Sequence, residues 1–353
     1  DLPVFQGATT YPCILVYDKA KPSRSFNVCE VRSLDFNDLN TYVEANSRKL
    51  DQRSLDDSGW SLANEAEQKL YNRLLRSGTI LGEHVNDQIY RGVLTGLNEA
   101  FVIDDTVRKA LIKADKRSAE LIKPFLAGRD IKRYEVPQGK RYLIFTRRGV
   151  DIDRYPAIRD HLAQFKKQLT PKPKGHIGAW SGRKAGAYKW YEIQDTVDYF
   201  AELDKPKIMF PDIAERMQAV YDTKGQYCVN TIYFIPKDDL MLLGILNSDL
   251  IQFIIARMST SIQGGYFRFF RQYLLQLPVV LGSEKQRKEV VALVESIMKL
   301  KAEAQVTKLP NQVEQLTQRI AHNEARLNEA VYEIYGLSKQ EVEMVEIAVR
   351  AST

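Results

Sequence analysis

The sequence predicts a mixed α/β (α+β) fold, in which a mixed-sheet domain is followed by an amphipathic helical hairpin region. Two short apolar runs, at residues 205–213 and 227–235, flank a polar turn and are typical of neighbouring strands. From Glu284 onward the apolar residues recur at three- and four-residue spacing, which is typical of amphipathic helices. The length of 353 residues is enough for two or three domains.

The first part of the chain predicts strands alternating with helices. Residues 13–17 (CILVY) and 26–31 predict two strands joined by a turn. Such a pair buries too little surface to be stable alone, so we expect it to belong to a larger sheet. Residues 82–104 predict further strands around a tight turn of small and polar residues. Apolar spacing predicts helices in three places: residues 38–50, 63–75 and 104–116.

The second part of the chain predicts buried and amphipathic helices. Residues 239–258 are apolar almost all round, which predicts a buried helix, interrupted near Asn247-Ser248. Pro310 separates two amphipathic stripes that we expect to pack antiparallel. Ser338 with Glu341 has the spacing of a capping box and predicts the start of a last helix.

Positive charge is concentrated in one stretch of the sequence. Residues 113–190 hold twenty Lys and Arg against seven Asp and Glu, a net charge of +13, whereas the whole chain carries +6. Aromatic residues and glycines interleave with these charges, as in GRKAGAYKW (182–190). This pattern is typical of a surface that binds nucleic acid. The alternative is a solvated charged face without a partner.

Composition excludes several classes of protein. The three cysteines lie far apart with no C-x-x-C pair, which predicts reduced thiols and a cytoplasmic protein. The most apolar run, LMLLGIL (240–246), is too short to span a bilayer, so we expect no membrane contact. The four histidines lack ligand spacing, so we expect no metal site. Because the first residue is Asp and the chain opens as if in mid-domain, we expect a fragment of a longer protein.

Several segments, in order along the chain, carry a resemblance to a known family. They are FQGATTYPCILVYDKAKP (5–22), QIYRGVLTGLNEAFVID (88–104), IKPFLAGRDIKRY (122–134), KWYEI (189–193), KPKIMFPDI (205–213), LLGILNSDLIQFIIARMS (242–259) and YFRFFRQYLLQLPVV (266–280). Together they resemble the C-terminal specificity, or target recognition, region of Taq-type adenine-N6 DNA methyltransferases. That group includes type IIG restriction-modification enzymes and BREX-like phage-exclusion methyltransferases. The last two segments are also similar to type I restriction specificity subunits.

This resemblance implies an organisation and a function. Residues 1–58 would be the C-terminal stub of a methyltransferase domain with a linker, residues 59–281 the DNA target recognition domain, and residues 282–353 a C-terminal helical region. The implied function is sequence-specific binding of double-stranded DNA. The implied second partner is the methyltransferase domain of the same parent chain, and the parent's implied cofactor is S-adenosylmethionine.

The catalytic half of such a methyltransferase is expected to be missing. The family holds its flipped adenine with an (Asn/Asp/Ser)-Pro-Pro-(Tyr/Phe) tetrapeptide. No two of the 13 prolines here are adjacent, so this tetrapeptide is absent from the chain. No glycine-rich turn with a downstream acidic residue offers a site for S-adenosylmethionine. We therefore expect this chain by itself to be no enzyme and to bind no cofactor, whether or not its parent also carries a restriction endonuclease.

Two other functions remain open from the sequence. Asp212, Asp222 and Lys224 fit the spacing of a metal-dependent nuclease, in which two carboxylates hold a metal ion beside a lysine. The simpler interpretation is that Asp222-Thr223-Lys224-Gly225 is a turn between two strands. The other alternative is a protein-interaction scaffold, in which the C-terminal helices hold a partner and the basic stretch is incidental.

The resemblance and the charge pattern together nominate residues for DNA contact. Phosphate contacts are expected from Lys123, Arg129, Lys132, Arg133, Arg147, Arg148, Lys172 and Lys174. Base-reading candidates, which lie beside small or flexible residues, are Arg183, Lys184, Tyr188, Gln263, Arg268 and Arg271. Near the expected junction with the methyltransferase domain, Arg91, Thr95 and Asn98 are expected to line the domain interface or the flipped-base pocket.

Overall fold

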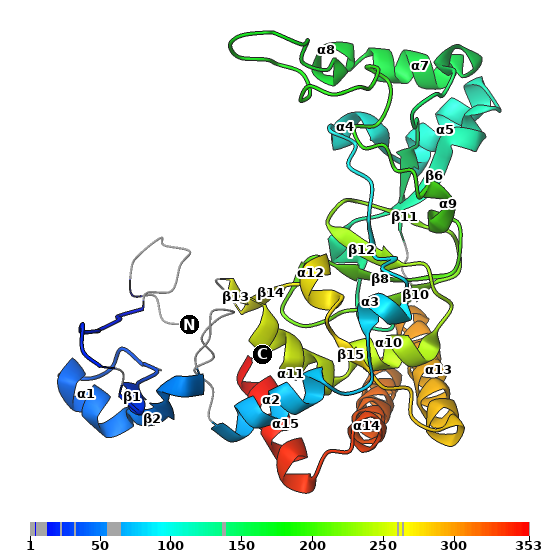
Figure 1. Cartoon of the computed structure of the whole chain (residues 1–353). Helices are drawn as coiled ribbons and strands as arrows, with labels where there is room; N and C mark the ends of the chain where they lie inside the picture. The colour runs from blue at the N-terminus through cyan, green and yellow to red at the C-terminus, as the bar shows by residue number, and fades with distance from the viewer. Residues whose placement is uncertain are drawn as a thin grey trace.

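The structure, a computed structural model, describes residue 4 and residues 13–21, 23–31, 33–54, 65–135, 139–259, 261–262 and 265–352. Most buried apolar side chains of these residues form two clusters. We call the cluster built mainly from helices the helical core and the one built between sheets and short helices the sheet core. Figure 1 shows the helical core below, the sheet core above it, and a small N-terminal unit to one side. The predicted mixed α/β class is confirmed.

The N-terminal unit contains one hairpin and one helix. Its elements are β1 (Ser25–Val28), α1 (Leu39–Asn46), β2 (Arg48–Asp51) and the 3-10 turn η1 (Gln52–Ser54). The two strands pair antiparallel with Phe26 opposite Leu50, and the Asp38 carboxylate caps α1 by accepting from Thr41 N at 2.7 Å. The strand predicted at residues 13–17 is wrong: Ile14 and Val16 are 80% and 89% exposed, and no described strand pairs with the run. Apolar sequence alone does not make a strand when no neighbouring strand offers backbone hydrogen bonds.

The helical core joins helices that are far apart in the sequence. They are α2 (Glu65–Leu75), α3 (Leu81–His84), α10 (Leu240–Asn247), α11 (Asp249–Met258), α12 (Arg271–Leu274), α13 (Glu284–Val306), α14 (Pro310–Ile334) and α15 (Lys339–Ser352). Packing between α10 and α13 is close, because a Cβ added to Gly244 would lie 2.9 Å from Val294. The helical region predicted to begin at residue 282 therefore shares one core with α10 and α11, and residue 281 does not divide that core.

The predicted interruption of the apolar helix is confirmed. Helices α10 and α11 are bent by 60° at Ser248, whose hydroxyl accepts from Ile251 N at 3.3 Å and caps α11. Just before the bend, the buried Asn247 amide pairs with both backbone groups of Ala219, at 2.8 and 2.9 Å. No single described helix is long and apolar enough to cross a membrane. The pair α10 and α11 meets that test only jointly, by length and composition.

The long C-terminal helices begin where their capping residues predict. Helix α13 starts with a capping box between Ser283 and Gln286, and α14 has Pro310 in its first turn. The two helices run antiparallel side by side (Figure 1), linked by a 2.9 Å hydrogen bond from Asn323 Nδ2 to Ser296 Oγ. The predicted capping box at Ser338 is confirmed, because the carboxylate of Glu341 accepts from Ser338 N at 2.8 Å.

Small sheets carry the rest of the chain. An antiparallel sheet has the order β10 (Val220–Asp222), β8 (Lys207–Pro211), β12 (Ile232–Ile235), β4 (Tyr90–Arg91). A mixed sheet has the order β11 (Tyr227–Cys228), β6 (Ile122–Leu126), β7 (Arg141–Ile144), β5 (Val102–Asp104), with only β11 and β6 parallel. A third sheet has the order β13 (Ser261–Ile262), β14 (Tyr266–Arg268), β9 (Ile213–Ala214), and β15 (Pro278–Val279) pairs with β3 (Thr79–Ile80). The strands predicted at 205–213 and 227–235 are confirmed, each divided into two pieces.

Short helices cover the mixed sheet at the top of the molecule in Figure 1. They are α4 (Asn98–Phe101), α5 (Asp105–Ala114), α6 (Ser118–Leu121), α7 (Pro156–Ala163), α8 (Lys166–Leu169) and α9 (Phe200–Leu203), with the 3-10 turns η2 (Gly128–Asp130) and η3 (Ile152–Arg154). The predicted helix at 104–116 is α5, and Asp104 caps it by accepting from Val107 N at 2.8 Å. Between α8 and α9 the chain forms a long irregular segment that leaves the body of the molecule and returns.

Candidate nucleic-acid interface

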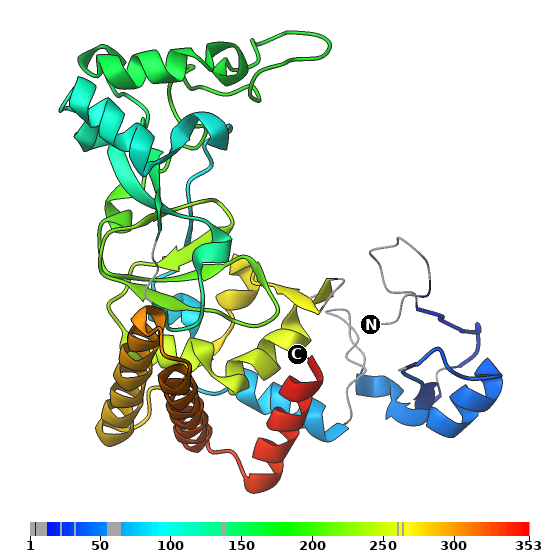
Figure 2. The same cartoon turned by 180° about the vertical axis from the view of Figure 1, so that it is seen from behind.

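One side of the molecule carries three projecting segments. The first is the irregular segment of residues 170–195, which we call the 170–195 loop. The other two are the β13–β14 hairpin and the N-terminal unit. Figures 1 and 2, which view the molecule from opposite sides, both place the three on the same flank. The two places predicted to read bases, one in the 170–195 loop and one at the β13–β14 hairpin, therefore lie on the same flank.

The outer part of the 170–195 loop is open and basic. Gly175 and Gly178 have φ values of +81° and +97°, and a Cβ at either would meet nothing within 4 Å. Lys174 and Lys184 are exposed. A 3.1 Å hydrogen bond from the Trp180 indole to Thr170 O joins the two ends of residues 170–180. The outer part thus presents cations on a closed base, and glycines permit its left-handed turns.

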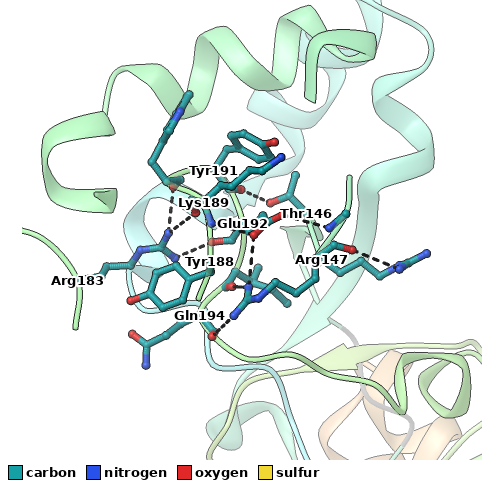
Figure 3. Close-up of polar contacts among 12 residues, drawn as sticks. Thr146, Arg147, Arg183, Tyr188, Lys189, Tyr191, Glu192 and Gln194 are labelled. Atoms are coloured by element: carbon teal, nitrogen blue, oxygen red, sulfur yellow. Dashed lines mark hydrogen bonds and ion pairs between the residues drawn. The ribbon is translucent and has the colours of Figure 1, made fainter. Parts of the chain in front are cut away.

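A buried arginine holds the inner part of the 170–195 loop. Arg183 is 4% exposed, and all five of its N–H donors reach backbone carbonyls (Figure 3). The acceptors are Leu169 O at 2.7 Å, Thr95 O at 2.8 Å, Glu192 O at 2.7 Å, Trp190 O at 3.0 Å and Lys189 O at 3.2 Å. Burial lowers the pKa of Arg183 to about 10, which leaves the guanidinium charged at neutral pH. We call this arrangement the Arg183 clamp.

A second arginine and a buried glutamate extend this clamp. Arg148 donates to the carbonyls of Ile193 and Gln194, the latter at 2.7 Å, and its guanidinium lies 5.0 Å from the centre of the Tyr188 ring. The carboxylate of Glu192 accepts from Gly149 N at 3.1 Å and from Lys189 N at 2.8 Å. These bonds connect the inner part of the 170–195 loop to the segment after β7.

Several of the residues predicted to contact DNA are engaged inside the fold. Arg183 cannot reach a base edge without breaking five hydrogen bonds, and the ring of Tyr188 is only 8% exposed. Arg148 is occupied by carbonyls, and Arg133 has a side chain only 13% exposed, 3.6 Å from Glu324 of α14. The sequence shows that these residues are basic or aromatic, but not that the fold turns their side chains inward.

The other residues predicted to contact DNA have side chains that solvent can reach, wholly or in part. Exposed side chains are those of Arg129, Lys132, Arg147, Lys174 and Lys184, whereas Lys123 and Lys172 are half-buried. Arg147 stacks 4.4 Å from the centre of the Phe200 ring, and the Lys172 ammonium lies 3.3 Å from Gly178 O. Gln263 lies outside the residues that the structure describes.

The residues near the expected domain junction divide into two kinds. Thr95 is buried at 1% exposure, and its hydroxyl donates to Asn98 Oδ1 at 2.7 Å while accepting from Leu97 N at 3.2 Å. This pair shapes the turn before α4, and burial makes a direct contact from Thr95 to a flipped base unfavourable. Arg91, by contrast, has a side chain 50% exposed, which donates to Asn230 O and lies 3.8 Å from Asp212.

Two of the predicted base-reading arginines lie on β14 or just after it. Arg268 on β14 stands opposite Ile213 on β9, and its guanidinium lies 5.3 Å from the centre of the Phe270 ring. Arg271 is exposed but donates to the carbonyls of Ile89 at 3.2 Å and Asp87 at 2.7 Å. Arg271 therefore supports the turn before β4.

The nuclease hypothesis is wrong on geometry. Asp222 is 2% exposed, lies 2.5 Å from the buried ammonium of Lys207, and accepts from Lys224 N at 2.9 Å and Gln226 N at 2.8 Å. It closes the turn, as the simpler interpretation had it. Asp222 pairs with Lys207 in register, and Asp212 is five residues beyond Lys207, so the Cα atoms of the two aspartates lie about 16 Å apart along the strand direction. Among the described residues, no three His, Cys, Asp or Glu side chains could hold a metal ion together.

Comparison with known proteins identifies the region that carries these features. Residues 123–279 match the TaqI-like C-terminal specificity domain. The predicted resemblance is thereby confirmed, and the matched residues include three strands of the mixed sheet (β6 from residue 123, β7 and β11), the 170–195 loop and the β13–β14 hairpin.

The relatives of the whole chain are methyltransferases by name. The chain is 25% identical over 289 residues to the Type II methyltransferase M.PaeR7I of Pseudomonas aeruginosa, covering 80% of this chain and 44% of the relative. It is 21% identical over 373 residues to M.BstVI of Geobacillus stearothermophilus, covering 98% of this chain and 59% of the relative. The chain thus spans about half the length of these curated relatives.

A solved structure shares the fold. The Type IIL restriction-modification enzyme MmeI, determined in complex with DNA, superposes with a TM-score of 0.53 and 14% sequence identity. The match covers 75% of this chain and 35% of that enzyme. At this identity the likeness supports the arrangement of elements alone.

Three functional features escaped the sequence analysis: the Arg183 clamp, the buried Lys207–Asp222 pair, and the ion pair of Arg91 with Asp212. Lys207 is the first residue of the apolar strand β8 (KIMFP), and this position could have indicated a buried ion pair, because a buried ammonium needs a carboxylate partner. Nothing in the sequence pairs Asp212 with Arg91, since they are 121 positions apart.

Proposed function

We propose that this chain binds double-stranded DNA in a sequence-specific manner, as the specificity part of an adenine-N6 DNA methyltransferase of a restriction-modification system. The single observation that carries the proposal is the 170–195 loop. It belongs to the specificity domain, it presents exposed lysines, and the Arg183 clamp fixes its base. A fixed basic loop contacts phosphates without losing conformational freedom on binding, which favours affinity.

The proposal includes a division of labour within a longer parent protein. The described residues include no Asn/Asp/Ser-Pro-Pro-Tyr/Phe motif and no glycine-rich strand-to-helix turn, so they do not fit S-adenosylmethionine or a flipped adenine. A methyltransferase domain of the parent chain would supply that chemistry, and the N-terminal unit would adjoin it. The role of the present residues would be to choose and hold the DNA site.

Salt dependence tests DNA binding. The dissociation constant for a labelled duplex is measured by fluorescence anisotropy at several salt concentrations, for the wild-type chain and for Lys174→Ala and Lys184→Ala. Each variant should bind more weakly and reduce the slope of log affinity against log salt by about one. Lys299→Ala, an exposed lysine of α13 on a different part of the molecule, is the matched control and should leave the slope unchanged.

Two outcomes would contradict the proposal. One is duplex binding that does not respond to salt. The other is an absence of duplex binding combined with salt-insensitive capture of a protein partner, which would favour the scaffold alternative.

A further inference from the structure

The outer end of the 170–195 loop carries an exposed isoleucine. Ile177 is 94% exposed, the highest value among the exposed large apolar side chains of the described residues. Gly175 and Gly178 stand on either side of it, and nothing lies within 4 Å of the point where either would carry a Cβ. The segment between α8 and α9 extends away from the body of the molecule (Figures 1 and 2). Almost the whole Ile177 side chain is therefore open to a partner from outside the chain.

Contacts within residues 172–180, which we call the loop tip, order the backbone around Ile177. His176 N donates to Pro173 O at 3.2 Å and closes a turn just before Ile177. The His176 ring lies 3.2 Å from Ala179 O, and its centre lies 5.1 Å from that of the Trp180 ring, edge to face. A turn that is already formed loses little conformational freedom on binding, which favours a contact made through Ile177.

The stretch of sequence around Ile177 is basic and contains no carboxylate. Between Asp160 and Glu192 there are seven Lys and Arg residues and no Asp or Glu. Lys174, three residues before Ile177, is exposed. This charge favours a polyanionic partner, whereas an apolar side chain gains nothing from contact with a phosphate. The loop tip therefore fits a polyanion that also offers an apolar surface.

A DNA duplex combines these two surfaces in one groove. Phosphates line the rims of the groove, and base edges form its floor. In an undistorted duplex the apolar group that the base edges present is the C5-methyl of thymine, which lies in the major groove. A lysine can reach a rim while an apolar side chain beside it reaches the floor.

We propose that Ile177 packs on a thymine methyl group in the recognised duplex, while Lys174 contacts a phosphate beside it. The inference rests on the proposed function and adds to it a residue and the base that this residue contacts. Uracil differs from thymine only by that methyl group, so the contact distinguishes the two bases. Ile177 carries no charge, so its contribution does not depend on salt.

Replacement of thymine by uracil tests the inference from the side of the DNA. A selection from randomised duplexes with the full 353-residue chain supplies a preferred duplex, and each thymine in it is then replaced singly by deoxyuridine. Dissociation constants are measured by fluorescence anisotropy. At one position the replacement should weaken binding by the wild-type chain about fourfold, as expected for the loss of one buried methyl group.

Variants at residue 177 test the same contact from the side of the protein. Ile177→Ala should bind the thymine and uracil duplexes equally at that position, and Ile177→Val, which keeps a branched apolar side chain, should retain most of the discrimination. Neither variant should alter the salt slope, in contrast to Lys174→Ala. Ile347→Ala, which replaces an isoleucine of α15 that is 60% exposed, is the matched control and should keep the wild-type discrimination.

Three results would overturn the inference. One is a wild-type chain that binds every uracil duplex as tightly as the thymine duplex. Another is an Ile177→Ala variant that binds more weakly but keeps the full discrimination, because Ile177 would then contact something other than the methyl group. The third is binding to phosphatidylserine vesicles that requires Ile177 while duplex binding does not, which would assign the loop tip to a lipid surface. A wild-type chain that binds no duplex overturns the proposed function itself, whereas duplex binding without discrimination overturns this inference alone.

Discussion

The Arg183 clamp allows a quantitative prediction about the conformation of the 170–195 loop. Replacement of Arg183 by alanine removes the partner of five backbone carbonyls inside the specificity domain. A buried carbonyl left without a partner costs about 1–3 kcal/mol, but water can enter the vacated space and reach some of the five. We therefore expect a local loss of about 3–5 kcal/mol, similar to breaking a buried ion pair.

Hydrogen exchange followed by mass spectrometry measures this loss where it occurs. The amides of Ile193 and Gln194 donate to Thr146 O at 2.9 Å and Thr95 O at 3.2 Å, so they report on the clamp. Since about 1.4 kcal/mol corresponds to a factor of ten, their exchange in Arg183→Ala should accelerate at least about 100-fold. Arg183→Lys should give a smaller acceleration, because one ammonium can reach only some of the carbonyls.

The exposed neighbour Lys184 supplies the control. Lys184→Ala removes a positive charge one residue away and should leave the exchange of residues 193 and 194 unchanged. Protection of these amides that survives in Arg183→Ala would refute the clamp as the source of loop order. Equal acceleration in both variants would show that charge, rather than the five hydrogen bonds, holds the loop.

Three further predictions concern stability, measured by urea or thermal denaturation. Lys207→Met should destabilise by about 3–5 kcal/mol because Asp222 is left charged, buried and without its ammonium, and Asp222→Asn in the same chain should restore part of the loss. Gly78→Ala should cost about 2 kcal/mol or more, since Gly78 has φ +66° and a Cβ would lie 2.2 Å from a carbonyl of β15. Burial lowers the pKa of His161, so stability should fall as pH drops below about 6.5, and His161→Gln should remove that part of the decline.

Each of these has a result that would contradict it. If Lys207→Met kept wild-type stability, the attraction between Lys207 and Asp222 would not offset the free-energy cost of burying the two charges. A neutral Gly78→Ala would mean that the turn between α2 and β3 relaxes freely. For His161, the unfolded chain takes up a proton near pH 6.5 whereas the folded chain does so only at lower pH. An unchanged pH profile in His161→Gln would assign the acid sensitivity to other groups.

The sequence by itself determined the local structure of this protein and its resemblance to TaqI-like specificity domains. The period of its apolar residues marks α13, α14 and the buried pair α10 and α11, and the caps Asp104, Ser248 and Ser338 mark where helices begin. These features depend on residues within one or two helical turns of each other, so they can be read from spacing alone. The resemblance to specificity domains rests on several short segments in a fixed order along the chain. Each of these segments can likewise be recognised from neighbouring residues alone.

Only the tertiary structure decided which charged residues are available. Arg183, Arg148 and Arg133 have the same side chain as Arg129 and lie in the same basic stretch, yet their guanidinium groups point to carbonyls or to Glu324 of the chain itself. The exposure of a side chain depends on elements that lie 40 to 200 residues away in the sequence, such as α14, which packs beside Arg133. Asp212 likewise acquires its neighbour Arg91 through the sheet in which β12 pairs with both β8 and β4. The spacing of residues in the sequence does not reveal such pairings, because they form only when the folded chain brings distant segments together.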